Sequence, residues 1–176
     1  TKTKLLDLPS VNLISESISE TALAYFEEKQ MPVQLMGVDS VFGQLTNIED
    51  IITDGHYEVF DGAFDRAVLG QGLAWKLGIG AHFIHAIEVY APKRKGQVNM
   101  LRPDVNFNSE RCFIAGTFAV NQQKYDENLM LVDIDLTRRL LDYDKTEVTA
   151  LQVGIAEGVS IRRAKREITS LLGDGY

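Results

Sequence analysis

The chain has 176 residues, of which 45% are hydrophobic and 24% charged, and Lys+Arg 18 against Asp+Glu 25 give a net charge of −7. This balance is that of an ordinary globular protein with one domain or two small lobes. The acidic excess excludes a typical duplex nucleic-acid binder, and we expect no nucleic-acid partner. No apolar run approaches the length of a membrane helix, and no signal peptide is visible. Because the chain starts TKTKLLDLPS without a methionine and stops abruptly at LLGDGY, we expect a piece cut from a longer protein.

The first part of the chain predicts strands and one short helix. Alternating apolar residues over 11–17 predict a strand. The segment ALAYFEEKQMPVQLMG, residues 22–37, predicts a hairpin whose turn lies at 28–30. Asp39 or Ser40 can then cap a short helix, because both side chains accept hydrogen bonds from free backbone N–H groups.

Residues 66–80, RAVLGQGLAWKLGIG, predict a buried strand, a glycine turn, two turns of helix and a glycine stop. Gly78 stands where a helix often ends in a left-handed residue. A strand, a Gly-x-Gly and a helix also suggest a dinucleotide fold. That fingerprint needs a third glycine where this chain has Trp75, and the helix is too short for a crossover between parallel strands. We therefore expect no nucleotide site here.

The second half of the chain mixes further strands with short helices. Asp135 and Ser160 are the predicted N-caps of two helices, and the second helix carries a clean apolar stripe. Strands and helices do not alternate regularly, which favours the α+β class over a doubly wound sheet. Four further strands are predicted from apolar runs at 87–91, 112–120, 129–132 and 148–155.

Two histidines and one cysteine are the residues best able to bind a metal or attack a substrate. His82 and His85 are spaced i, i+3, but a zinc site needs further ligands and none stands at a diagnostic spacing. Partly exposed loop histidines are the simpler interpretation. Cys112 lies in an apolar run, where a thiol is usually a small buried hydrophobe. We expect no metal site and no enzyme activity.

Charged residues gather at two places. Glu58, Asp61 and Asp65 could supply a pair of carboxylates for acid–base chemistry, but acidic residues in a glycine-rich loop are usually solvated. The last helix carries a basic patch, which is either a solvated surface or a docking face for acidic headgroups or a partner. The patch consists of Arg162, Arg163, Lys165 and Arg166.

Four segments, taken in order, resemble a known family. They are VQLMGVDSVFGQL from residue 33, AVLGQGLAWKLGIG from 67, FIAGTFAVNQQKYDENLMLVDIDLTRRLL from 113 and LQVGIAEGVSIRRAKREITSLLGDGY from 151. In them the chain resembles the extracytoplasmic domain of ABC-transporter permeases of the Lol, MacB and FtsX superfamily, and the lipoprotein-release branch is the nearest match. Ala81-His82-Phe83 departs from the Val-Gly-Asp that many members have after Leu-Gly-Ile.

The resemblance implies a domain that lies between the first two membrane helices of a permease. The parent would be an inner-membrane protein with this domain in the periplasm. It would contact an ABC ATPase and a partner permease through the membrane helices. ATP would be handled by the separate cytoplasmic ATPase, so this domain would need no cofactor. The family has a discontinuous Porter lobe, here 1–62 and 146–176, with a Sabre lobe inserted at 63–145.

The resemblance also implies a contact site and a function. In the lipoprotein-release branch a hairpin hooks the periplasmic lipoprotein carrier, and the matching segment here is 92–110. Its apolar residues are the predicted protein contacts, although a self-packed loop is the alternative. The domain would couple ATP-driven motion to lipoprotein release, or else serve a MacB-like efflux pump or an FtsX-like regulator of wall hydrolases. An unrelated small enzyme is a third hypothesis. The predicted contacts are Met100, Leu101, Pro103 and Phe107.

Overall fold

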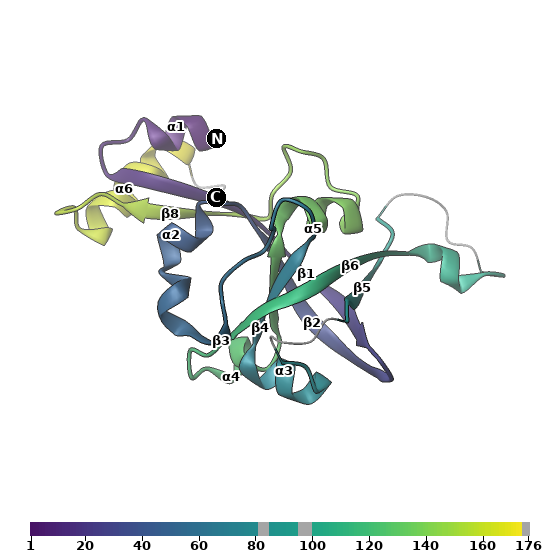
Figure 1. Ribbon diagram of the computed structural model, residues 1–176. Helices are drawn as coiled ribbons and strands as arrows, with labels where there is room; N and C mark the ends of the chain where they lie inside the picture. The colour runs from purple at the N-terminus through teal and green to yellow at the C-terminus, as the bar shows by residue number, and fades with distance from the viewer. Residues whose placement is uncertain (81–84, 95–99, 174–176) are drawn as a thin grey trace.

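The computed structural model describes residues 1–80, 85–94 and 100–173 of the chain (Figure 1). Within these ranges strands of mixed direction carry short helices, so the predicted α+β class is confirmed. No helix in them is long and apolar enough to cross a membrane. The elements are α1 (Lys2–Leu6), β1 (Val11–Phe26), β2 (Lys29–Val38), α2 (Phe42–Thr46), η1 (Ile48–Ile51), β3 (Ile52–Gly55), β4 (Arg66–Gly70), α3 (Gln71–Leu77), β5 (Ile87–Pro92), η2 (Pro103–Asn106), β6 (Phe107–Phe118), α4 (Gln123–Asp126), β7 (Leu129–Asp133), α5 (Ile134–Leu141), β8 (Ala150–Ile155) and α6 (Ile161–Leu172).

Among the described residues, six strands close into a ring in the order β1-β2-β7-β4-β6-β5 and back to β1. The pairs β2–β7 and β4–β6 are parallel, and the other four are antiparallel. Successive side chains of a strand point to opposite faces. Ala67 and Leu69 of β4 accordingly join the cluster inside the ring, whereas Val68 joins a second cluster outside it. The ring therefore has a filled interior and one covered outer face.

Two helices complete the interior of the ring. α3 supplies Leu73 and Leu77, and α5 supplies Leu136 and Leu140, all of them at most 2% exposed. In Figure 1, α5 lies above the ring strands and α3 below them. Each fully buried leucine contributes roughly 1.5–3 kcal/mol relative to an exposed one, so the interior cluster holds most of the fold together.

The outer cluster lies under α2 and η1. Val38, Phe42 and Ile48 pack there against Val68 of β4 and Phe118 of β6. The short helix after the predicted hairpin is confirmed as α2, but its predicted cap is wrong: the N-cap is Val41, which has no side-chain cap hydrogen bond. Asp39 Oδ1 instead accepts a hydrogen bond from the backbone N–H of Val41 at 3.1 Å, one residue before the helix.

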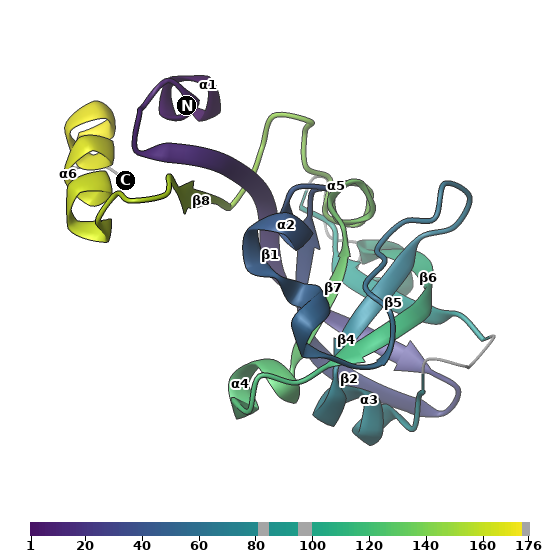
Figure 2. The same cartoon turned by 60° about the vertical axis from the view of Figure 1, so that its left-hand side comes forward.

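A smaller unit extends from the ring and contains both ends of the described chain. The first half of β1 pairs there with β8, while α1 and α6 cover them (Figure 2). Leu5, Val11 and Ile14 form its separate cluster, with Leu151 and Ile168 packed against them. We call residues 1–17 and 148–173 the terminal unit, and the described residues of 18–147 the ring unit. β1 belongs to both.

The hydrophobic clusters do not follow the predicted lobe boundaries at residues 62 and 146 closely. β2, β3 and α2 lie within 1–62, yet they pack with strands that come after residue 63. Along the chain, residues pass from the terminal unit's cluster to the ring's cluster within β1, and they pass back shortly after residue 146. The division into 1–62 with 146–176 and 63–145 stays a prediction.

Several local predictions can be compared directly with the structure. The strand–glycine–helix prediction for 66–80 is confirmed, and Gly78 ends α3 in the left-handed region with φ 77°. The hairpin is also confirmed, but its turn lies at 27–28 and not at the predicted 28–30, because Phe26 already pairs with Lys29; Glu27 in the turn has φ 54°. The predicted cap of α5 is wrong: the N-cap is Asp133, whose Oδ1 accepts from the backbone N–H of Asp135 at 2.7 Å. Asp133 and Asp135 flank Ile134, and the helix begins two residues earlier than expected.

Candidate functional site

The segment predicted to contact a partner lies at the end of the β5–β6 ladder. β5 and β6 pair antiparallel, and the last pair of the ladder is Pro92 with Phe107. Beyond it, the backbone N–H of Lys93 donates to the carbonyl of Asn106 at 2.8 Å. The start of β6 and η2 extend away from the ring in Figure 1. We call residues 92–107 the arm; residues 95–99 within it lie outside the described ranges.

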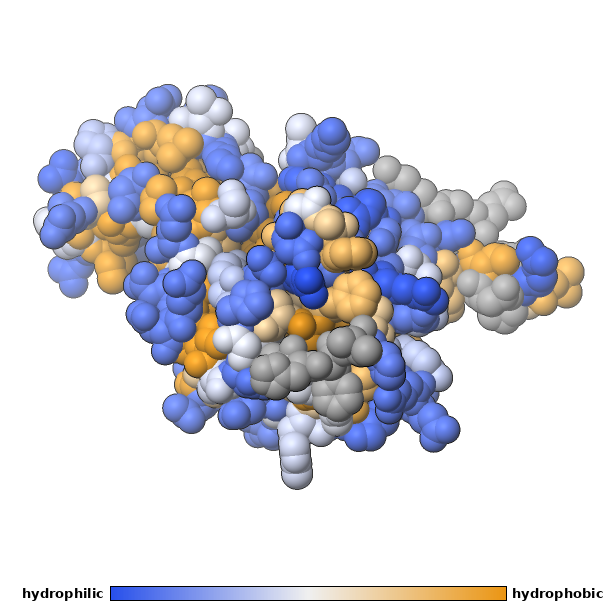
Figure 3. Space-filling model, viewed as in Figure 1, coloured by the Kyte–Doolittle hydropathy of each residue, from blue (hydrophilic) through white to orange (hydrophobic). Residues whose placement is uncertain are grey.

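Apolar side chains are exposed on the arm. Met100 is 89% exposed, Leu101 95% and Phe107 48%, and Figure 3 shows apolar surface at the arm's end. Phe107 lies at the base of the arm, whereas Met100 and Leu101 precede η2 farther out. Pro103 begins η2, and its side chain lies outside the described part. Adjacent exposed apolar residues of this size mark contact surfaces, and methionine adapts well to a partner's shape.

The base of the arm is fixed to the ring unit. Asn108 Nδ2 donates to the carbonyl of Leu140 at 3.0 Å and to Asp142 Oδ2 at 3.1 Å. These bonds hold β6 against the end of α5, where Asp142 is a left-handed C-cap. The base of the arm and the C-terminal end of α5 are therefore joined by side-chain hydrogen bonds.

A second set of contacts connects the arm with β1. The guanidinium of Arg94 lies 3.9 Å from the centre of the Tyr143 ring and 3.7 Å from Glu147. The Tyr143 hydroxyl donates to Glu20 of β1 at 2.9 Å. Burial and the hydrogen bond to Glu20 raise the pKa of Tyr143, so the hydroxyl remains a donor at neutral pH. The arm is thus linked to the strand that both units share.

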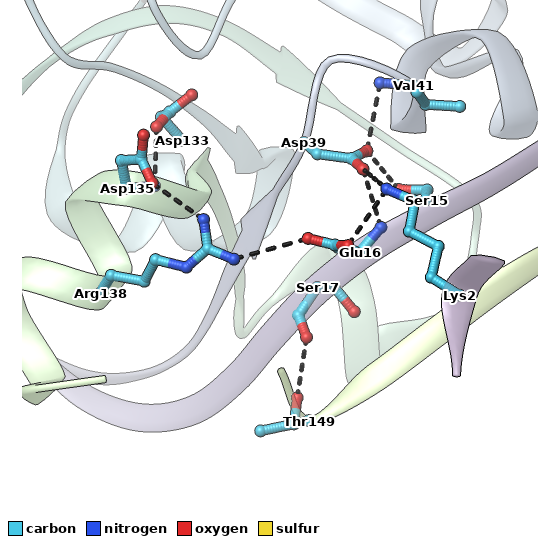
Figure 4. A network of polar contacts seen from close by, with 10 residues as sticks. All are labelled: Lys2, Ser15, Glu16, Ser17, Asp39, Val41, Asp133, Asp135, Arg138 and Thr149. Atoms are coloured by element: carbon cyan, nitrogen blue, oxygen red, sulfur yellow. Dashed lines mark hydrogen bonds and ion pairs between the residues drawn. The ribbon is translucent and has the colours of Figure 1, made fainter. Parts of the chain in front are cut away.

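The junction between the two units is polar (Figure 4). Glu16 of β1 lies 3.1 Å from Lys2 of α1 and 3.5 Å from Arg138 of α5. Asp39 accepts from the Ser15 hydroxyl at 2.7 Å and from the Glu16 backbone N–H at 2.9 Å. Charged groups of both units therefore meet on the middle of β1, where a change in their relative position would rearrange the pairs.

The predicted acidic cluster does not form a carboxylate pair for acid–base chemistry. Asp61 accepts from the backbone N–H groups of Phe64 and Ala63 at 2.7 and 2.9 Å and also binds Arg66. The two backbone bonds and the arginine lower the pKa of Asp61 to about 2, so it is ionised at neutral pH. Asp65 instead pairs with Arg139 at 2.6 Å. Glu58 lies 4.0 Å from the same Arg66 that binds Asp61, so all three carboxylates have basic partners and two of them share one.

The two predicted histidines and the predicted cysteine lie in different surroundings. His82 lies outside the described residues, and His85 is 3.7 Å from Glu27. In the described ranges, no three His, Cys, Asp or Glu side chains gather as metal ligands would. Cys112 is fully buried inside the ring, and burial raises the pKa of its thiol.

We expect Cys112 to resist thiol reagents in the folded chain. Only the thiolate reacts, so the thiol must lose its proton and the reagent must reach the sulfur. Burial of the strand disfavours both. A maleimide dye should react about a thousandfold or more slowly with the native chain than with the chain in denaturant, because access requires unfolding. Rapid labelling of the native chain, followed by mass spectrometry, would contradict the buried position.

Two surface features were not among the predictions from the sequence. A hollow of about 570 Å³ lies between the β1–β2 hairpin and α4, lined by residues that include Val33, Met36 and Tyr125. Trp75 on α3 is 83% exposed. The hollow depends on which elements meet in space, and periodicity within one segment does not report that. Trp75 lies on the side of α3 opposite the buried Leu73 and Leu77, which explains its exposure.

The fold was compared with known proteins. No family model matches the chain, and no curated protein sequence matches it. The extracellular domain of the noncanonic ABC-type transporter YknZ from Gram-positive bacteria shares the fold with a TM-score of 0.62 at 12% identity, over 96% of this chain and 80% of that one. The periplasmic region of MacB from Actinobacillus actinomycetemcomitans does so with a TM-score of 0.63 at 11% identity, over 97% of this chain and 70% of that one. At such identities the likeness establishes the fold, and it confirms the fold that the resemblance implied.

Proposed function

We propose that this chain is the extracytoplasmic domain of an ABC transporter permease, held outside the cytoplasmic membrane, in the periplasm. The observation that carries the proposal is the fold, which this chain shares over nearly its whole length with the YknZ and MacB domains. ATP would be bound by a separate cytoplasmic ATPase, and the domain itself would do no covalent chemistry. A partner permease would meet it through membrane helices that lie outside this sequence.

The position of the two end helices supports this arrangement. α1 and α6 lie side by side on the terminal unit (Figures 1 and 2). A domain inserted between two membrane helices needs its ends close together, and these elements meet that need. The ring unit with its arm then points away from the membrane.

We further propose that the transporter releases lipoproteins and that the arm contacts a periplasmic carrier. Met100 and Leu101 would be buried by the carrier, with Phe107 and Pro103 nearby. Their exposure supports this role, because large apolar side chains are costly to leave in water.

The coupling would be mechanical. Nucleotide binding below the membrane would favour one arrangement of the two lobes, and the arm would move with the lobe that carries it. The polar contacts of Glu16 at the junction and the anchoring of Asn108 at the arm's base support such a transmission. The Porter and Sabre division at 1–62, 63–145 and 146–176 is part of this proposal.

A MacB-like efflux pump is the second candidate. It is favoured by the fold shared with the periplasmic region of MacB. In that case the arm would meet a channel adaptor rather than a lipoprotein carrier.

The two candidates differ in what ATP releases. We would prepare membrane vesicles that hold the full-length protein and its ATPase, and add a soluble periplasmic carrier. Lipoprotein should appear in the soluble fraction only with ATP and carrier together, and not with an ATPase that cannot hydrolyse ATP. Movement of a small molecule without lipoprotein release would replace the first candidate by the second. Activity of neither kind would contradict the transporter proposal.

A further inference from the structure

The charge of this chain is unevenly distributed between its two units. The terminal unit has six basic and four acidic residues, whereas the ring unit, 18–147, has 12 basic and 20 acidic ones. An acidic protein with a net charge of −7 therefore has one basic end. The basic residues of this end are Lys2, Lys4, Arg162, Arg163, Lys165 and Arg166.

The basic residues of α6 share one outward side of the helix. A helix advances about 100° per residue, which places Arg162, Lys165 and Arg166 within about a third of its circumference. Ala164, which is fully buried, lies on the opposite side. Arg163 differs from its neighbours because it pairs with Glu167 at 2.8 Å. We call Arg162, Lys165 and Arg166 the basic face of α6; all three are exposed.

An exposed apolar side chain borders this face: Ile161, one helical turn before Lys165, is 75% exposed at the start of α6. Other apolar side chains of the terminal unit are exposed away from the face, with Leu171 on the side of Ala164 and Leu6 on α1. Figure 3 shows apolar surface on the terminal unit between hydrophilic groups. Basic heads with an apolar residue beside them suit the boundary between lipid headgroups and acyl chains.

We infer that the basic face of α6 binds the anionic headgroups of a bilayer. The sign of the charge points to an anionic partner, and the apolar border favours a bilayer over a fully polar surface. That a membrane lies at this end rests on the proposed function, since α1 and α6 would then lead into the membrane helices. The contact would hold the terminal unit against the membrane while the ring unit moves.

The test is binding of the chain to lipid vesicles. One set consists of phosphatidylcholine and the other of an equal mixture of phosphatidylcholine and phosphatidylglycerol, each at low and at high salt. We expect flotation with the mixed vesicles only, weakened by salt because exposed charges are screened. Arg162→Glu with Arg166→Glu should lower the affinity by at least about tenfold, given about fivefold for each basic residue near an anionic surface.

A matched control changes the same charge elsewhere. Lys124→Glu with Lys145→Glu alters two exposed lysines of the ring unit and should leave vesicle binding unchanged. Equal binding to both vesicle types, equal loss in both double variants, or no binding to mixed vesicles would overturn the inference. If the basic face then bound an acidic protein instead, that partner would replace the lipid. None of these results bears on lipoprotein release, which is measured separately.

Discussion

Replacing Met100 and Leu101 together by aspartate is expected to reduce lipoprotein release by at least about tenfold. A buried contact loses roughly 1.5–3 kcal/mol for each large apolar side chain that no longer leaves water, and 1.4 kcal/mol is a tenfold change in binding. Aspartate also adds two charges that the partner would have to desolvate. Release would be measured in membrane vesicles with ATP and the carrier.

The same double variant should leave the domain's stability almost unchanged. Both side chains are at least 89% exposed, and surface changes usually shift the free energy of unfolding by no more than about 0.5 kcal/mol. Trp75→Asp, which alters a similarly exposed side chain on α3, is the matched control and should keep full release. Normal release by the arm variant would remove the arm from the proposed contact.

The largest effect on stability is expected from Leu69→Ala. Leu69 is fully buried inside the ring on β4, which pairs with β6 on one side and β7 on the other. Truncation leaves a cavity that paired strands cannot easily close, and such changes cost about 2–5 kcal/mol. Urea unfolding followed by circular dichroism should therefore give a clearly lower midpoint with a similar slope.

Leu101→Ala is the matched control, because it makes the same chemical change at a solvent-exposed position. Leu101 is 95% exposed, so its removal should shift the free energy of unfolding by at most about 0.5 kcal/mol. A similar loss in both variants would mean that the ring interior is not the core of this fold.

Local chemistry explains why parts of the fold were predictable. Gly70 and Gly78 bracket α3 as expected, because each glycine stands where a specific backbone conformation or approach is needed. A Cβ at Gly70 would lie 2.4 Å from the carbonyl oxygen of Asp126, so only glycine fits there. Ser160 caps α6 as predicted, its hydroxyl accepting from the Arg163 N–H.

Pairing between distant segments was beyond such reasoning. The sequence predicts separate strands at 11–17 and 22–28, but β1 is continuous because Ile18 and Ala22 both face the ring interior. Closure of the ring depends on β1 meeting β5, and β1's other half meets β8 near the end of the chain. Neither contact leaves a trace in local periodicity.

The candidate site also has one part that the sequence could predict and one part that it could not. The resemblance, together with the polar composition of 92–110, predicted that Met100 and Leu101 are exposed apolar groups, and both are exposed. The anchoring of the arm by Asn108 and by Arg94 on Tyr143 needs α5 and its following loop to lie beside β6. Only the assembled fold places these groups together.

Photo-crosslinking at the arm tests the central claim most directly. A photoreactive amino acid would replace Leu101 or Phe107 in the full-length membrane protein in cells, with exposed Lys124 as the control position, and captured proteins would be identified by mass spectrometry. The account predicts a periplasmic lipoprotein carrier at the two arm positions and not at Lys124. A channel adaptor at the arm would support the efflux candidate instead. Capture of no envelope protein at either arm position would contradict the arm as the contact site.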